Sequence, residues 1–322
     1  MFDLFPIKHD IPFMSYARTT TVISLVTFVL AVFFLFTRGL HLSVEFTGGT
    51  VLELAFEQPV KADDLRTELE RAGIPDPTIV NLGTSRDVMI RVPVIPKLSS
   101  AQLSETIMST LRQGGGQVEM RRVEFIGPQI GQELWSDGAW AIGFVCLGIM
   151  AYLAFRFEWR FSVAAVIANM HDVVIILGFF AFFQWEFSLT VLAAVLSVLG
   201  YSVNESVIVF DRIRENLRKM KSRSTAEIIN NAITRTMSRT VITHGATQLV
   251  VTSMLFMGGE VLHYFALALT IGILFGIYSS VLVASPIVLW LGVSRADFVK
   301  GEGGDAPAER RPARKREVQP GE

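Results

Sequence analysis

Charged residues are scarce in this 322-residue chain: Asp, Glu, Lys and Arg make up 18% of it, whereas hydrophobic residues make up 51%. A typical soluble domain contains about a quarter charged residues. The mean hydropathy of +0.44 is correspondingly high, because long apolar runs account for the deficit of charge. The composition therefore excludes a soluble enzyme and predicts a protein that crosses a membrane several times.

The chain also lacks the residues for a disulfide framework or a cysteine metal site, since its one cysteine, Cys146, lies inside an apolar run. The five histidines are scattered and show no spacing typical of metal ligands. The glycine pairs and triplets are not followed by Lys-Ser or Lys-Thr, so they do not indicate phosphate-binding loops. We therefore expect no metal, no cofactor and no nucleic-acid partner, and any work must draw on a gradient or a partner protein.

Six apolar stretches approach the length of a membrane-spanning helix, which needs about 20 mainly apolar residues. The fifth is the weakest, because it carries Thr243, His244, Thr247 and Gln248. The first is not interpreted as a cleaved signal peptide, since residues 37–41 offer no small-x-small processing site. The stretches are 20–36, 138–155, 161–183, 189–210, 241–257 and 262–291.

Lysine and arginine predict the orientation, because they concentrate in loops on the cytoplasmic side of a membrane. They occur before the first span, after the second, throughout 211–240 and in the tail, whereas 184–188 and 258–263 contain none. All basic loops fall on one side if both the N-terminus and the C-terminus are cytoplasmic. The predicted parts are a cytoplasmic N-terminus (1–19), a first spanning helix (20–37), an outer domain (38–137), five spanning helices (138–292) with a cytoplasmic loop (211–240), and a disordered cytoplasmic tail (293–322).

The outer domain has the sequence pattern of a small α+β fold. Alternating hydrophobic residues predict strands at 51–56, 78–82, 87–92 and 118–126, and helical spacing predicts helices at 62–72 and 100–111, the second with Ser100 as its N-cap. The order β-α-β-β-α-β is typical of a ferredoxin-like fold. Because a fold does not specify a function, the domain is either a plain structural module or a surface for an unfolded polypeptide or a partner.

Polar residues inside the apolar spans are the main functional candidates, because ionisable groups at membrane depth are costly and usually face a bundle interior or water. In the third span, Asn169 and Asp172 share a helix face, with His171 beside them. In the fourth span, Asn204 and Glu205 interrupt an otherwise apolar helix.

Glu205 is the strongest candidate for a proton-driven switch. Burial disfavours the charged form of a carboxyl group unless a cation is close, and Arg239 at the start of the fifth span is the predicted cation. A carboxylate that alternates between a paired, charged state and an unpaired, protonated state can act as such a switch. The alternative is a static ion pair that holds two helices together. Asp172 leaves two similar alternatives open, a functional group or a buried hydrogen-bond partner of Asn169 or of a neighbouring helix.

Small residues in the sixth span predict close helix packing. Gly272, Gly276 and Ser280 recur at intervals of four residues, which is the spacing of a small-xxx-small seam between membrane helices. We interpret this stripe as packing and not as a binding site.

Several motifs together resemble one known family. Residues 44–49 (VEFTGG) resemble an Asp-Phe-x-Gly-Gly motif, and residues 126–134 (IGPQIGQEL) resemble a Val-Gly-Pro-x-Val-Gly-x-Glu-Leu motif. Segments 156–160, 171–172, 200–216 and 239–243 extend the likeness in the same order along the chain. The sequence is on this basis similar to the SecF members of the SecD/SecF family of RND-type membrane proteins. The motif residues singled out are Glu45, Gly48, Gly49, Gly127, Pro128, Gly131, Asp211 and Arg212.

The resemblance implies a non-enzymatic half-transporter in the bacterial inner membrane, with six transmembrane helices and a periplasmic ferredoxin-like domain between the first two. It implies SecD as the other half, the SecYEG channel and an unfolded preprotein as partners, YidC and YajC as further ones, and contact with membrane lipid. It also implies that the proton motive force drives the outer domains to pull or release the preprotein. We expect Glu205, Arg239, Asp172 and Asn204 to form the proton relay or ion pair.

The chain departs from the family pattern at three positions. Glu45 and Glu205 stand where the family usually has Asp, so each carboxylate is kept with one extra methylene. His244 stands where a small hydroxyl residue is usual, and the sequence leaves its role open.

Two other functions remain as alternatives: a small-solute exporter, which predicts a roomy substrate pocket and larger outer domains, and a structural scaffold that clamps the channel without moving.

Overall fold

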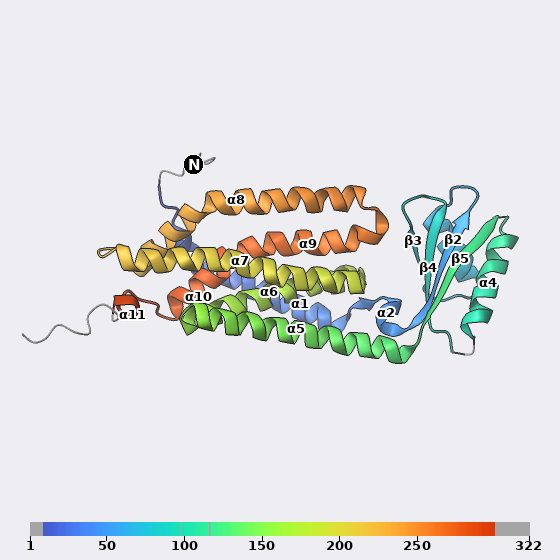
Figure 1. Ribbon diagram of the computed structural model, residues 1–322, viewed down its shortest axis with the longest axis horizontal. Helices are drawn as coiled ribbons and strands as arrows, with labels where there is room; N and C mark the ends of the chain where they lie inside the picture. Colours follow the sequence, from blue (N-terminus) through green and yellow to red (C-terminus); the bar gives the residue numbers. More distant parts are fainter. Residues whose placement is uncertain (1–8, 97, 116, 300–322) are drawn as a thin grey trace, which may run out of the picture.

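The computed structural model of the chain describes residues 9–96, 98–115 and 117–299 (Figure 1). It consists of a long helical bundle with a smaller sheet domain at one end. Six helices are long and apolar enough to cross a membrane, which confirms the predicted number of spans and the fold class. Residues 1–8 and 300–322, which belong to the predicted terminal segments, lie outside the described residues.

The spanning helices extend well beyond the apolar runs. Helices α7 and α8 include most of the predicted loop 211–240 and leave only a short connection at 220–224. Ser224 explains the start of α8, because it forms a capping box with Glu227. The helical segments are η1 (Phe13–Tyr16), α1 (Ala17–Thr37), α5 (Pro128–Arg156), α6 (Trp159–Phe183), α7 (Leu189–Lys219), α8 (Thr225–Met257), α9 (Gly259–Ser279), the π-helical η2 (Ser280–Ala284), α10 (Ser285–Trp290) and α11 (Ala296–Val299).

Three of the spans form the centre of the bundle. In α6, in α7 and in the span formed by α9, η2 and α10, more than half of the most apolar 18-residue stretch is buried inside the protein. In α1, α5 and α8, less than a fifth of that stretch is buried. Polar groups on α6, α7 and α9 are therefore the ones that this chain can shield from lipid without a partner subunit. The outer helices leave apolar surface for lipid or another membrane subunit.

The sheet domain has the predicted ferredoxin-like topology. Its antiparallel strands follow the order β3-β4-β2-β5, and the core side chains of both helices pack with those of the sheet. One local detail differs from the prediction: Ser99, not Ser100, caps the second helix, because its hydroxyl accepts the backbone N–H of Gln102. The elements are β2 (Gly49–Phe56), α3 (Ala62–Arg71), β3 (Thr78–Asn81), β4 (Asp87–Pro93), α4 (Ser100–Gln113) and β5 (Val118–Ile126).

Three short elements that sequence patterns did not predict connect the sheet domain to the bundle. Strand β1 (His41–Leu42) follows α1 and pairs in parallel with β6 (Glu186–Phe187), which lies between α6 and α7. Helix α2 (Val44–Thr47) then leads into β2. The start of the sheet domain is thus attached directly to the corner between α6 and α7, two of the three most buried spans.

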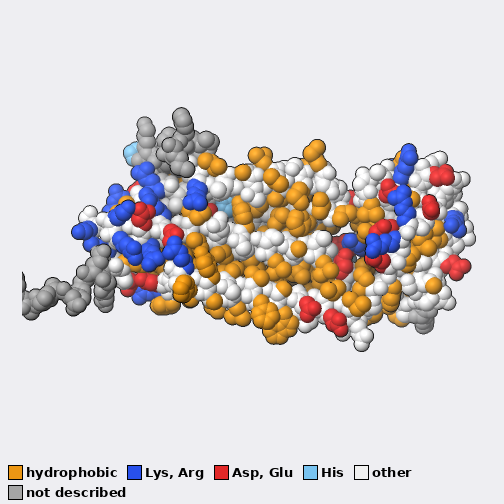
Figure 2. Space-filling model, in the orientation of Figure 1, with side chains coloured by type: hydrophobic (Ala, Val, Ile, Leu, Met, Phe, Trp, Pro, Cys, Tyr) orange, Lys and Arg blue, Asp and Glu red, His pale blue; other side chains and the backbone are white. Residues whose placement is uncertain are grey.

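Basic side chains gather at the end of the bundle that is farther from the sheet domain (Figure 2). The two loops without Lys or Arg lie at the opposite end, since Glu186 belongs to β6 and Glu260 accepts hydrogen bonds from Asn81 of β3. This distribution agrees with the charge pattern on which the predicted orientation depends, while the direction of the chain across the membrane stays a prediction.

The stripe of small residues in the sixth span faces α7. A Cβ atom at Gly272 would lie 2.2 Å from Val198 Cγ2, and one at Gly276 would lie 3.5 Å from Ser202 Cβ. One turn further, Ser280 Oγ lies 3.3 Å from Ser206 Oγ. The absence of side chains at the two glycines therefore lets α9 approach α7 closely.

We expect Gly272→Ala to lower the free energy of unfolding by about 1–3 kcal/mol, because Val198 is β-branched and cannot rotate freely away from the added methyl group. Thermal unfolding of the purified protein in detergent measures this effect. Gly148→Ala is the matched control, since a Cβ atom there meets nothing within 4 Å. Equal unfolding temperatures for the two variants would contradict the assignment of the seam.

Candidate functional site

Glu205 lies in the middle of α7 and is 2% exposed. The Thr240 hydroxyl donates a hydrogen bond to Oε1, and the Nε2 atom of His244 lies 3.2 Å from Oε2. Thr240 and His244 are four residues apart on α8, so they project from the same face of that helix. Both carboxylate oxygens are therefore occupied by side chains of the neighbouring span.

The predicted contact between Glu205 and Arg239 is not formed: among the described residues, no Arg239 nitrogen is within 4 Å of a Glu205 carboxylate oxygen. Arg239 is instead exposed on the outer face of α8. The reason is helical geometry, because consecutive residues are about 100° apart around the axis. A helix that directs Thr240 inward cannot direct Arg239 the same way. Asn204 is likewise exposed, although Glu205 beside it in α7 is buried.

Asp172 forms a second buried acidic site. Its Oδ2 atom accepts hydrogen bonds of 2.7 Å from the hydroxyls of Ser202 on α7 and Ser279 on α9. Its Oδ1 atom lies 3.4 Å from Nδ1 of His171. Asn169 is not its partner, and both amide atoms of Asn169 are buried without a hydrogen-bond partner among the described residues. Asp172 thus joins the three central spans.

The two acidic sites contact neighbouring positions of α7. Ser202, which binds Asp172, and Glu205 are three residues apart, so they lie about one turn from each other along the same helix. The Asp172 site faces α9, whereas the Glu205 site faces α8. A change of charge at either site therefore acts on one shared helix.

The two glycine motifs come together at the base of the sheet domain. A Cβ atom at Gly131 would lie 2.4 Å from the carbonyl oxygen of Phe46, and one at Gly49 would lie 2.4 Å from that of Val92. Gly48 has a φ of +79°, and a Cβ atom there would lie 2.9 Å from the backbone of Pro128. Glycine is therefore required for α2, β2 and the start of α5 to pack this closely. Gly127 caps α5, and Pro128 takes its first position, where a missing N–H costs little.

Arg91 links this joint to the membrane bundle. Its guanidinium lies 3.1 Å from both carboxylate oxygens of Glu186 in β6 and 3.6 Å from Oε1 of Glu45 in α2. The Arg91 side chain is only 13% exposed, so water screens these contacts less than it screens a surface pair. One cation of the sheet domain thus holds two acidic groups, one of them in the corner between α6 and α7.

The remaining motif residues lie at the other end of the bundle. Asp211 forms an ion pair of 2.9 Å with Arg156, and Arg212 forms one of 2.6 Å with Glu215. Both pairs are partly exposed. The structure therefore does not bring Asp211 or Arg212 into contact with Glu205.

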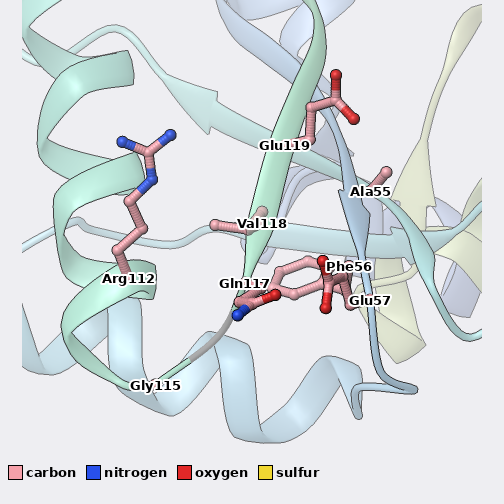
Figure 3. Close-up of a pocket in the computed structure, with 8 residues that line it drawn as sticks. All are labelled: Ala55, Phe56, Glu57, Arg112, Gly115, Gln117, Val118 and Glu119. Atoms are coloured by element: carbon pink, nitrogen blue, oxygen red, sulfur yellow. The ribbon is translucent and has the colours of Figure 1, made fainter.

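A cavity of about 630 Å³ lies in the sheet domain, between the end of α4 and β5 (Figure 3). Charged groups of both signs line it, among them Glu57, Arg112 and Glu119. No candidate residue of the sequence analysis contributes to its lining, which separates it from the buried acidic sites.

Sequence patterns missed several of the groups that complete these sites. Ser202 and Ser279 are hydroxyl residues in apolar runs, which is a weak signal because serine can also bond to its own helix. Arg91 and Glu186 are far apart in sequence, and neither belongs to a motif. His244 was noted, but no local pattern indicated its partner.

Comparisons with known proteins agree on one family. The family model described as "Protein export membrane protein SecD/SecF, C-terminal" matches residues 106–294, and the "SecD/SecF GG Motif" model matches residues 33–60. The chain is 42% identical to the protein translocase subunit SecF of Vibrio alginolyticus, over 92% of this chain and 94% of that protein. It is 40% identical to SecF of Escherichia coli O157:H7, over 84% and 86% respectively.

Two crystal structures of SecDF are similar in fold. The first is the translocon-associated membrane protein SecDF from Thermus thermophilus, with a TM-score of 0.77, 37% identity and coverage of 89% of this chain. The second is SecDF in a super-membrane-facing form, with a TM-score of 0.71, 35% identity and coverage of 92%. The present chain spans only 39% and 41% of the length of these two chains.

We expect Arg91→Gln to loosen the attachment between sheet domain and bundle, because it leaves Glu45 and Glu186 close together without a cation. Breaking a fully buried ion pair costs about 3–5 kcal/mol of stability. Because Arg91 is partly exposed, we expect the attachment to be weakened by about 2 kcal/mol. Hydrogen exchange of the Ser43 amide, which donates to the carbonyl of Phe187, should become about tenfold faster or more.

Arg86→Gln is the control for this substitution, because Arg86 is an exposed arginine of the same domain. Unchanged exchange in the Arg91 variant would show that the β1–β6 pairing, and not the ion pairs, holds the joint.

Proposed function

The chain belongs to the SecD/SecF family of protein export membrane proteins, and from this premise we propose that it uses the proton motive force to promote preprotein translocation through SecYEG. Its relatives are named as translocase subunits, which supports an auxiliary subunit of the Sec translocase in the inner membrane. The observation that carries the energetic part is the carboxyl group of Glu205, buried at the middle of a spanning helix.

The surroundings of Glu205 favour a proton over a fixed ion pair. Thr240 is neutral and His244 can gain or lose a proton, whereas no arginine or lysine of the described chain is in contact with the carboxylate. The net charge of the site can therefore change by one when a proton binds. One charge crossing 100 mV yields about 2.3 kcal/mol, which is enough to bias a two-state movement strongly.

The route from this site to the sheet domain runs through the α6–α7 corner. Asp172 and Glu205 lie on the two helices that β6 connects, and Glu186 of β6 is bound by Arg91 of the sheet domain. A shift of α7 relative to α6 displaces that corner and with it the Arg91 contact. The close packing of the glycine motifs provides the pivot about which the sheet domain turns.

SecD is the proposed partner in the membrane. Arg239 and Asn204 are exposed on the bundle surface, and a charged or amide group at membrane depth is costly unless protein or water covers it. The solved SecDF chains are more than twice as long as this chain, which is long enough to include a second helical bundle. We place that bundle against the surface with Arg239 and Asn204, so that these residues belong to the relay across the interface and not within one subunit.

The proposed orientation has both termini in the cytoplasm and the sheet domain in the periplasm. The Lys- and Arg-rich end of the bundle would then face the cytoplasm, as the positive-inside rule requires. An outer domain of this size, with one four-stranded sheet, favours handling of a preprotein over a small-solute exporter with larger outer domains.

We expect Glu205→Gln to abolish the proton-gradient stimulation of export, with a fall of about tenfold or more, because glutamine keeps the shape of the side chain but cannot change its charge. Export of a secreted reporter into membrane vesicles, with and without a proton gradient, measures this. Glu215→Gln, at the exposed end of the same helix, should leave the stimulation unchanged.

Co-purification of the variant with its partner subunits distinguishes a motor from a scaffold. Normal complex yield with slowed export supports the proposal, whereas full gradient-driven export in Glu205→Gln overturns it.

A further inference from the structure

His244 makes a contact that neither the motifs nor the family comparison assigns. It is 3% exposed, and its Nε2 atom lies 3.2 Å from Oε2 of Glu205. A histidine beside a carboxylate adds a second group that can bind or release a proton. The buried site therefore contains two titratable side chains from two different helices.

The surroundings of His244 contain little else that ionises. From α7, besides Glu205, the ring of Tyr201 meets the imidazole edge-on at 4.9 Å, and the Tyr201 hydroxyl is bonded to Thr247. From α9, residues 265–277 contribute no ionisable side chain. On α8 itself, Arg239 is exposed on a different face. Within the described chain, Glu205 is thus the charged group that His244 contacts directly.

The other ring nitrogen indicates which form of histidine fits this arrangement. Nδ1 of His244 is buried and has no hydrogen-bond partner in the described part of the chain. A neutral imidazole satisfies the geometry if Nε2–H donates to Glu205 and Nδ1 keeps only a lone pair. An imidazolium would place an N–H group at Nδ1 with no acceptor, which is unfavourable in a buried site.

We propose that Glu205 and His244 together form the proton-binding site, with His244 as its second titrating member. This inference rests on the proposed proton-driven function. With one proton on the imidazole and none on the carboxylate, the pair has a charge of −1. One further proton, bound at Nδ1 or at a carboxylate oxygen, makes the pair neutral, and only an N–H or O–H bond forms or breaks.

The pair also couples proton binding to helix position. Protonation at Nδ1 requires an acceptor that this arrangement lacks, and protonation of the carboxylate removes the charge that attracts Nε2–H and the Thr240 hydroxyl. Protonation of the carboxylate therefore weakens the present contact between α7 and α8, whereas protonation at Nδ1 strengthens the attraction between His244 and Glu205 and leaves a buried N–H without an acceptor. His244 is accordingly a positioning residue as well as a proton acceptor.

The test compares His244→Gln with the unchanged protein in the assembled complex. Glutamine can still donate a hydrogen bond to Glu205, but it cannot titrate. Infrared difference spectroscopy follows the protonated carboxyl band of Glu205, which Glu205→Gln identifies by its loss. We expect proton uptake in His244→Gln to require about a tenfold higher proton concentration, and the pH profile of export to move by about one unit toward acid.

His263→Gln is the matched control, because His263 is exposed near the start of α9. If His244→Gln does not assemble, His244→Asn provides a smaller amide for the same measurement. A purely structural role for His244 predicts that the amide variants restore both the titration and the pH profile.

The outcomes separate this inference from the proposed function. If Glu205→Gln retains gradient-driven export, the proposed function fails and the pair has no role in it. If Glu205→Gln loses export while His244→Gln titrates and exports like the unchanged protein, the proposed function stands and the paired site is overturned.

Discussion

A carboxyl group that is buried among helices, with no lysine or arginine of the described residues within 4 Å of it, is the constraint on which the structure depends. Taking Glu205 out of water is costly, and the bundle offsets that cost with one hydroxyl and one imidazole from α8. Because neither donor carries a fixed charge, the site stays sensitive to protons. An arginine in the same place would stabilise the carboxylate and also keep it ionised.

The mechanism that we propose requires such a change to be transmitted from the membrane to the sheet domain. The stripe of small residues lets the sixth span pack closely against α7, so in the proposed mechanism α7 would move as a packed unit. The α6–α7 corner then meets Arg91, and the glycine motifs fix the sheet domain at one narrow joint. In the proposed mechanism, rigid helices with one tight joint would convert a small shift in the membrane into a rotation outside it.

Sequence patterns predicted the features that depend on local periodicity. The six spans and the ferredoxin-like order follow from apolar runs and alternating residues, which belong to single elements. The contacts of Glu205 did not follow, because the direction of Arg239 depends on how α8 is rotated about its axis, and one residue changes that direction by about 100°. The Arg91–Glu186 pair and the pairing of β1 with β6 join segments far apart in sequence, and no pattern within one segment indicates them.

The exposed position of Arg239 separates two conclusions that the sequence had joined. If Arg239 had formed an ion pair with Glu205 inside one bundle, binding of a proton to Glu205 would have depended directly on the position of Arg239. Here the carboxylate has its own partners, and Arg239 is left on a surface that lipid covers at high cost. The proposed second bundle therefore rests on Arg239, whereas the proposed proton site rests on Glu205 and His244.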